Sequence, residues 1–146
     1  MLIETKILME EGPSRKADGV LVCDDNRLIL KFMVSMLGEL GYKAFKSETP
    51  GEAIKIAQAE TDSIALHLLD IDLPGMDGRA LHRLLKEYSP DAKCILVSGY
   101  SKEYIEDSGC IPVGVGFIQK PFGYEAFVDE IREAVDVLSK ASANCS

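Results

Sequence analysis

The chain has 146 residues, of which 47% are apolar and 27% are charged, and this length and composition suit a single globular domain. Its net charge of −8 argues against direct nucleic-acid binding, which would need a basic patch for the phosphates. No apolar run reaches the roughly 18 residues of a membrane span, and residues 1–19 lack the clean apolar block of a signal peptide. We therefore expect a cytoplasmic protein that does not enter a membrane.

Short apolar runs alternate with helical patterns along the chain, which predicts strands and helices alternating around a parallel sheet. The expected strands are residues 20–23, 42–46, 64–69, 94–97 and 113–118, and the expected helices are residues 27–40, 50–60, 79–90, 102–108 and 124–140. The run IALHLL at 64–69 is apolar on both faces, as a central parallel strand must be. The predicted fold class is therefore α/β, with five strands in one sheet. Residues 1–18 are predicted to be a flexible N-terminal extension and residues 141–146 a flexible tail.

Short motifs predict where helices begin and where the chain turns. Residues 49–52, TPGE, have the capping-box spacing with proline at the first helical position. Pro74-Gly75 suits a tight turn. Asp77 is predicted to cap the helix that follows, and Gly78 to let the chain pass closely.

Polar residues follow four of the predicted strands, at the edge where an open parallel sheet binds its ligands. Asp24 and Asp25 follow the first strand, Asp70 and then Asp72 the third, Ser98 the fourth and Lys120 the fifth. Carboxylates this close need a counter-charge, which a magnesium ion with oxygen ligands can supply. One carboxylate could then attack phosphorus and form an aspartyl phosphate, while the lysine and the hydroxyl hold phosphoryl oxygens.

Each of these features has a simpler interpretation when it is taken alone. The pair Asp24-Asp25 can be a loop and helix cap, and Lys120 can be a solvated surface lysine. Their combination, in this order and at these strand ends, is what indicates a phosphoryl-transfer site. His67 falls in a buried strand and His82 on a helix, so each is interpreted as a core or surface histidine rather than a phosphohistidine.

Four motifs together resemble the receiver domain of two-component response regulators, in its chemotaxis-regulator-like form. They are VLVCDDN at the first strand, LLDIDLPGMDG after the third, ILVSGYS after the fourth and GFIQKPF after the fifth. The resemblance covers about residues 19–140 and implies a doubly wound, flavodoxin-like (βα)5 fold with strand order 2-1-3-4-5. It also implies a phosphorylated signalling module rather than a turnover enzyme.

The resemblance assigns the acidic residues to phosphorylation and metal binding. Asp70 is the expected phosphoacceptor. Asp25 and Asp70 would bind Mg²⁺ directly, together with the backbone carbonyl of Asp72, and Asp24 would act through a bound water. Mn²⁺ is expected to substitute for Mg²⁺.

The resemblance also assigns a phosphoryl contact and a switch. Lys120, joined to Pro121 by a cis peptide bond, would contact the phosphoryl group. Ser98 would sense it by moving toward it, and Phe117, at the aromatic switch position, would then turn inward. The face made by the fourth helix, fifth strand and fifth helix would repack, and a homodimer is also expected to use this face.

The expected phosphoryl donor is a sensor histidine kinase or a histidine phosphotransfer protein, and the output partner is a protein of unknown identity. Asp72 and Tyr100 each lie two residues after a site residue, at Asp70 and Ser98. We hypothesise that these two side chains together set the rate of dephosphorylation.

Two alternatives stay open. A haloacid-dehalogenase-type phosphatase would also use Asp70 as a nucleophile, with Asp72 as general acid, but such enzymes place their acid pair after this motif rather than before it. The context is also open between a single-domain response regulator and the receiver module of a hybrid histidine kinase. The initial Met and the chain's own tail favour the single-domain interpretation.

Overall fold

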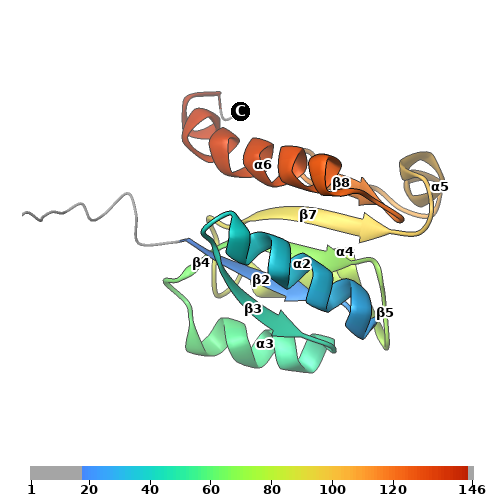
Figure 1. The fold of residues 1–146 in the computed structure, drawn as a ribbon, viewed down its shortest axis with the longest axis horizontal. Coiled ribbons are helices and arrows are strands. Elements are labelled where there is room, and N and C mark those ends of the chain that lie inside the picture. Colours follow the sequence, from blue (N-terminus) through green and yellow to red (C-terminus); the bar gives the residue numbers. More distant parts are fainter. Residues whose placement is uncertain (1–17, 145–146) are drawn as a thin grey trace, which may run out of the picture.

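A five-stranded parallel sheet forms the centre of the computed structural model, which describes residues 18–144 (Figure 1). The strands are β2 (Gly19–Cys23), β3 (Lys43–Ser47), β4 (Ile64–Asp70), β7 (Lys93–Ser98) and β8 (Gly116–Gln119). They lie in the order β3-β2-β4-β7-β8, and all neighbours are parallel. The predicted fold class and strand order are therefore confirmed. The predicted N-terminal extension lies outside the described residues except for Asp18.

Helices of the described chain cover both faces of this sheet. They are α2 (Arg27–Glu39), α3 (Pro50–Ala59), α4 (Gly78–Leu85), α5 (Lys102–Asp107) and α6 (Tyr124–Asn144). α2 and α6 pack on one face, whereas α3, α4 and α5 pack on the other (Figure 1). Among residues 18–144, no helix is both long enough and apolar enough to cross a membrane.

Each face of the sheet has its own apolar core, because successive strand residues point to opposite sides. Leu68 of β4 is buried with Met33 of α2 and Phe127 of α6. The next residue, Leu69, is buried in the opposite core with Leu81 of α4. The central strand β4 is thus packed on both faces, as its sequence predicts, and this packing fixes the position of the residues at its carboxyl end.

Three element boundaries differ from the prediction by more than two residues. α4 ends at Leu85 rather than at residue 90. β8 begins at Gly116 rather than at residue 113, because Gly114 has a φ of 87° and the Val115 N–H donates to the Pro112 carbonyl in a turn. α6 continues to Asn144, so residues 141–144, which were expected in the flexible tail, belong to the helix.

A short antiparallel hairpin after β4 was not predicted. β5 (Asp72–Leu73) pairs with β6 (Met76–Asp77), so that Asp72 lies opposite Asp77. The two residues between these strands are Pro74 and Gly75, and Gly75 has a φ of 79°. Proline followed by a left-handed glycine is the sequence that a type II turn requires, so the predicted tight turn is present. The hairpin returns the chain from the carboxyl end of β4 to the start of α4.

The predicted caps are also present. Asp77 caps α4, because its Oδ1 accepts the Arg79 N–H at 2.7 Å. Thr49 caps α3 by accepting the Glu52 N–H at 3.2 Å. These side chains satisfy backbone donors that the first helical turn leaves without partners.

Gly78 lies where the start of α4 crosses the end of β4. A Cβ at this position would collide with the Asp70 carbonyl and lie 3.0 Å from the Ile71 Cα. The Gly78 N–H also donates to the Ile71 carbonyl at 2.9 Å. The close passage predicted for Gly78 is therefore observed, and it brings the helix start against the backbone of the candidate site.

Two buried histidines form a direct contact that was not predicted. His67 of β4 is fully buried, His82 of α4 is nearly so, and their Nδ1 atoms lie 3.0 Å apart. His67 Nε2 is buried with no hydrogen-bond partner. A buried ring nitrogen without a partner costs less free energy as an unprotonated acceptor than as an N–H donor, so His67 Nε2 is assigned no proton. His67 Nδ1 then carries the proton and donates it to His82 Nδ1. The core interpretation thus holds for both residues.

Burial lowers the pKa of His67 to about 3, with further lowering by the positive charge on His82 and Lys86. Burial, aided by the positive charges of Lys86 and Arg83, lowers the pKa of His82 to about 4. Both imidazoles are therefore neutral in the folded protein at neutral pH. The unfolded chain, with histidines near 6.5, binds more protons at pH 4–6.5 than the folded chain does.

The histidine pair predicts a loss of stability in mild acid. As the pH falls from 6.5 to about 4, these two residues together should lower the free energy of unfolding by roughly 5 kcal/mol. Urea unfolding at a series of pH values should show a flatter dependence for the double variant His67→Leu/His82→Leu. Burial raises the pKa of Asp70 to about 6, so this carboxyl group titrates in the same pH range with an effect of opposite sign. The double variant and its reference protein should therefore both carry Asp70→Asn. Parallel pH dependences for the two proteins would contradict the prediction.

Candidate functional site

The carboxyl ends of four neighbouring strands bring the predicted site residues together at one edge of the sheet. Asp24 follows β2, Asp70 ends β4, Ser98 ends β7, and Lys120 follows β8. The strands are parallel neighbours, so these side chains converge although they are far apart in the sequence. Asp24, Asp70 and Ser98 are buried. Charged groups held this far from water need partners of opposite charge or hydrogen-bond donors.

Three carboxylates form the acidic part of the site. One oxygen each of Asp24, Asp25 and Asp70 lies within 4.8 Å of the others. Asp25 is exposed, whereas Asp24 is fully buried. The N-cap of α2 is the next residue, Asn26, whose N–H donates to Asp24 Oδ1 at 2.9 Å. The simpler interpretation of the acid pair as a helix cap is therefore wrong, because Asn26 caps the helix.

Lys120 supplies the positive charge that these carboxylates face. Its Nζ lies 3.0 Å from Asp24 Oδ2 and 3.3 Å from Asp70 Oδ2. Burial alone would lower its pKa, but the two carboxylates outweigh burial and hold the pKa of Lys120 above its ordinary value. The lysine is thus charged at neutral pH and bridges two strands. The interpretation of Lys120 as a solvated surface residue is wrong. The Lys120–Pro121 peptide bond is cis, as expected.

Asp70 is the carboxylate with the most perturbed protonation. Burial and the neighbouring Asp24 charge raise its pKa to about 6, although Lys120 and the Asp72 N–H oppose the shift. The Asp72 N–H donates to Asp70 Oδ1 at 3.2 Å. One lysine therefore compensates two buried carboxylates incompletely, and the site retains an excess of negative charge.

The donor set fits a hard divalent cation. Asp24 Oδ2 is buried and lacks an aligned hydrogen bond, since its contact with Lys120 is an ion pair only. Carboxylate oxygens, joined by a backbone carbonyl, are the ligands that Mg²⁺ binds. Asp25, Asp70 and Asp24 are placed to hold it, and the short hairpin brings the Asp72 backbone next to Asp70. Direct coordination by Asp25 and a water-mediated role for Asp24 stay predictions.

A hydrogen bond joins the Ser98 side chain to the Tyr100 backbone. Ser98 is buried, and its Oγ accepts the Tyr100 N–H at 3.0 Å. The Lys120 N–H donates to the Ser98 carbonyl at 2.7 Å, which ties the lysine to the end of β7. The Tyr100 side chain is half exposed and stacks on Tyr104 of α5 at 4.6 Å between ring centroids.

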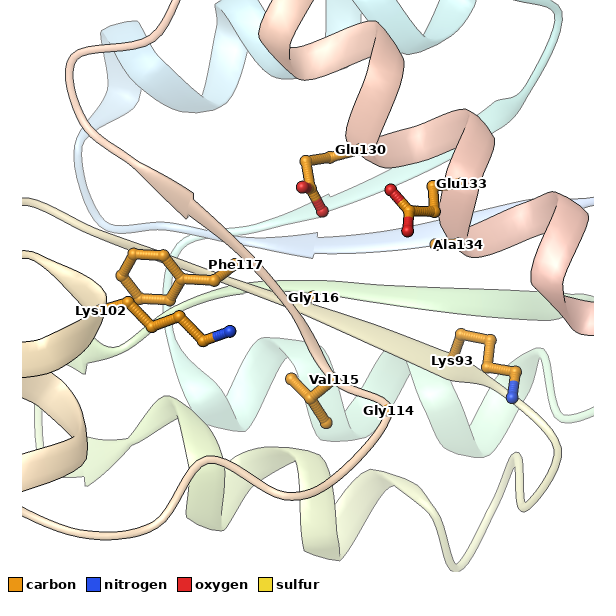
Figure 2. A pocket seen from close by; sticks show the side chains of 9 residues that line it. All are labelled: Lys93, Lys102, Gly114, Val115, Gly116, Phe117, Glu130, Glu133 and Ala134. Carbon is orange, nitrogen blue, oxygen red and sulfur yellow. The ribbon is translucent and has the colours of Figure 1, made fainter. Parts of the chain in front are cut away.

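Phe117 lies on β8 at some remove from the carboxylates. It is partly buried against the core under α3, α4 and α5, and it lines a pocket of about 490 Å³. Figure 2 shows its ring beside the Lys102 side chain, while Glu130 and Glu133 lie across β8 on α6. The predicted switch residue is therefore at the face between α5 and α6, and not in the cluster of Asp24, Asp25 and Asp70.

Asp72 and Asp77 occupy different positions in the hairpin. The Asp72 side chain is exposed. The Asp77 carboxylate binds Arg79, which holds the pKa of Asp77 below its usual range mainly by the side-chain hydrogen bond between them. Arg79 was not predicted as a site residue. Its proximity to Asp77 in sequence was a weak signal. Its other partners, the carbonyls of Ile105 on α5 and of Gly109 just after α5, lie 26 and 30 residues away and left no local pattern.

A doubly wound (βα)5 domain with a cluster of carboxylates and a paired lysine at the carboxyl edge of its sheet is the architecture of a receiver-type domain. Residues 20–132 match the family described as the response regulator receiver domain. This chain therefore belongs to that family.

Several known proteins are similar to this chain. It is 28% identical over 114 residues to the response regulator receiver protein CpdR of Brucella abortus, covering 78% of this chain and 93% of that protein. It is 27% identical over 117 residues to the sensor kinase CckA of the same organism, covering 80% of this chain but 12% of that kinase. A CheY-like receiver structure from Methanospirillum hungatei superposes with a TM-score of 0.69 at 27% identity, covering 85% of this chain and 98% of that one.

The raised pKa of Asp70 predicts that this carboxylate destabilises the metal-free fold. The folded protein binds more protons than the unfolded chain between pH 3.8 and about 6, so stability falls as the pH rises through that window. In EDTA at pH 8, Asp70→Asn should raise the free energy of unfolding by roughly 2–3 kcal/mol, and the gain should shrink toward pH 4. Urea unfolding followed by circular dichroism measures both values.

The matched control for this prediction is Asp72→Asn, which removes an exposed carboxylate two residues away. Its effect should be much smaller than that of Asp70→Asn. Equal stability of the wild type and Asp70→Asn at pH 8 would show that Lys120 already compensates the buried charge.

Proposed function

We propose that this chain is a phosphoacceptor in a two-component or phosphorelay system, and that Asp70 receives a phosphoryl group from a partner phosphohistidine. The observation that carries the proposal is the position of Asp70 between a second buried carboxylate and a lysine at 3.3 Å. A stability argument does not account for this arrangement, because the excess negative charge is unfavourable. A site that receives a cation and a phosphoryl group does account for it.

The proposed reaction is an in-line transfer between nitrogen and oxygen. A carboxylate oxygen of Asp70 attacks phosphorus, the new O–P bond forms, and the N–P bond of the donor imidazole breaks. The departing ring nitrogen keeps the electron pair of that bond and takes a proton from solvent. When Mg²⁺ is bound at the acidic residues, it supplies charge that offsets the carboxylates and the phosphoryl oxygens.

The chain's own residues position and neutralise the reacting groups. Lys120 already contacts Asp70, and its ammonium group is placed to pair with a phosphoryl oxygen when that group is added. Ser98 lies at the end of the neighbouring strand and offers a hydroxyl to another phosphoryl oxygen. Burial of Asp70 strengthens these interactions because the local dielectric is low.

The proposed output is a change of the face formed by α5, β8 and α6. A phosphoryl group on Asp70 would draw Ser98 toward it and leave space into which Phe117 can turn. Phe117 lines the pocket on that face, so its reorientation would change the surface that a partner protein meets (Figure 2). Phenylalanine has no hydroxyl group, and a partner of this chain therefore reads shape at this position rather than a hydroxyl contact.

A phosphorylated signalling module is the proposed class, and not a phosphatase that turns over. The acid pair precedes the Asp-x-Asp motif in the chain, and the matched family is that of receivers. CpdR and CckA indicate two contexts, a small receiver protein and a kinase of which a receiver is a part. A sensor histidine kinase or a histidine phosphotransfer protein is the proposed donor in either case.

Phosphorylation of Asp70 is the direct test of this function. Incubation with acetyl phosphate or phosphoramidate and Mg²⁺ should add one phosphoryl group, detected by intact-protein mass spectrometry. The group should be absent in Asp70→Asn and after addition of EDTA, but present in Asp72→Asn. Lack of modification in the wild type would overturn the proposal. Many turnovers of a small phosphate ester per protein molecule would favour the phosphatase.

Asp72 and Tyr100 are expected to control the lifetime of the phosphorylated form. Asp72→Asn and Tyr100→Ala should each change the decay rate by about threefold or more, since these exposed side chains are proposed to control water near the phosphoryl group. Tyr100→Ala should accelerate decay by removing a ring that shields the site. Asp72→Asn should slow decay if the carboxylate orients water and accelerate it if the carboxylate repels water. Unchanged decay in both variants would remove these residues from the mechanism.

A further inference from the structure

Arg79 is not one of the acidic site residues, but all three of its guanidinium nitrogens donate hydrogen bonds. Its side chain is 12% exposed and lies in the first turn of α4. Nε and Nη2 bind the two oxygens of Asp77 at 3.0 and 2.7 Å. Nη1 donates to the carbonyls of Ile105 at 3.2 Å and Gly109 at 2.9 Å. The guanidinium thus joins two segments: the hairpin that contains Asp77 and the carboxyl end of α5.

The first of these segments leads to the phosphoacceptor. Asp77 of β6 pairs with Asp72 of β5 across the short hairpin. The Asp72 N–H in turn donates to Asp70 Oδ1. A bidentate arginine-carboxylate pair fixes the orientation of both groups, so Arg79 holds the hairpin that carries the Asp72 carbonyl.

The second segment is the carboxyl end of α5. This helix has six residues, and only Ile105 among them is buried. Its last turn contains no basic residue, so Arg79 supplies the positive charge that stabilises the carbonyl end of a helix. A helix this short does not form without tertiary contacts. The bonds from Arg79 therefore join the burial of Ile105 and the Ser101 cap among the contacts that position α5.

Gly109 contributes to the same contact. A Cβ at this position would lie 3.2 Å from Arg79 Nη1, closer than ordinary van der Waals contact. The absence of a side chain lets the guanidinium reach the Gly109 carbonyl. The contact therefore depends on arginine at position 79 and on glycine at position 109.

We propose that Arg79 is a positioning residue that couples the hairpin beside Asp70 to the carboxyl end of α5. This inference rests on the proposed function, because it states how phosphorylation of Asp70 reaches the output face. α5 begins at its cap Ser101, three residues after Ser98, and is tied to Arg79 at its other end. The helix is thus connected to the phosphorylation site at both ends, and a shift of the hairpin moves α5 or breaks a charge-assisted hydrogen bond.

The test compares Arg79→Gln with Arg83→Gln. Arg83 lies one turn further along α4 and is exposed, so the control removes the same charge from the same helix. Amide hydrogen exchange of residues 102–110 is measured by mass spectrometry before and after treatment with acetyl phosphate and Mg²⁺. In Arg79→Gln, exchange of residues 105–110 should be about tenfold faster before treatment and should no longer respond to phosphorylation. Arg83→Gln should behave as the wild type.

A conservative variant separates positioning from charge. Arg79→Lys keeps the positive charge but loses the fork that binds Asp77 and two carbonyls together. It should restore overall stability more fully than it restores the response of residues 105–110. If Arg79→Gln does not fold, Asp77→Asn tests the same contact, because it removes the carboxylate charge that Nε and Nη2 bind but keeps a side-chain oxygen to cap α4. It should also weaken the response.

The outcomes distinguish this inference from the proposed function. A wild type that takes no phosphoryl group overturns the proposed function. A phosphorylated wild type whose response at residues 105–110 is unchanged by Arg79→Gln overturns the coupling role alone. An equal effect of Arg79→Gln and Arg83→Gln also overturns it, because loss of charge on α4 would then explain both.

Discussion

The structure depends on one electrostatic constraint, which is that Lys120 faces two buried carboxylates. Asp24 and Asp70 are held at the ends of neighbouring strands by apolar packing on both sides of the sheet. A single ammonium at 3.0 and 3.3 Å cannot neutralise both. Burial and the Asp24 charge raise the pKa of Asp70, and Lys120 offsets the shift only in part. The fold tolerates this unfavourable charge because the two cores on either face of the sheet stabilise the strands independently of the site.

The same constraint explains why the site is suited to binding and not to stability. Buried charge that lacks full compensation can be relieved by a cation or by a phosphoryl group that engages the lysine. The exposed Asp25 completes an acidic set that reaches solvent, so an incoming ion or donor can approach it. The receiver family to which the chain belongs is consistent with this chemistry, and the proposed function derives its mechanism from it.

The hairpin between β4 and α4 shows how a loop can link chemistry to shape. The two aspartates of the hairpin and the one that ends β4 have separate contacts. Asp70 lies in the cluster of carboxylates with Asp24 and Asp25. Asp72 donates its N–H to Asp70, and Asp77 caps α4 and binds Arg79. Gly78 lets the helix start directly against the Asp70 backbone. The connections from Asp70 through this hairpin to Arg79 and α5 are short, as the proposed switch would require.

Local patterns in the sequence determined much of this protein. The apolar run of β4, the caps Thr49 and Asp77, and the turn at Pro74-Gly75 all depend on neighbouring residues, so they could be predicted. The convergence of Asp24, Asp70, Ser98 and Lys120 could also be predicted, because parallel strands end at one edge.

The tertiary structure alone decided which side chains meet across elements. The contact between His67 and His82, the double pairing of Lys120 and the bonds from Arg79 to α5 join residues 15 to 96 positions apart. Such contacts arise from the packing of helices on the sheet and leave no periodic pattern in the chain. The start of β8 at Gly116 has a local cause instead, because a turn at Gly114, closed by the bond from the Val115 N–H to the Pro112 carbonyl, withdraws the preceding residues from the sheet.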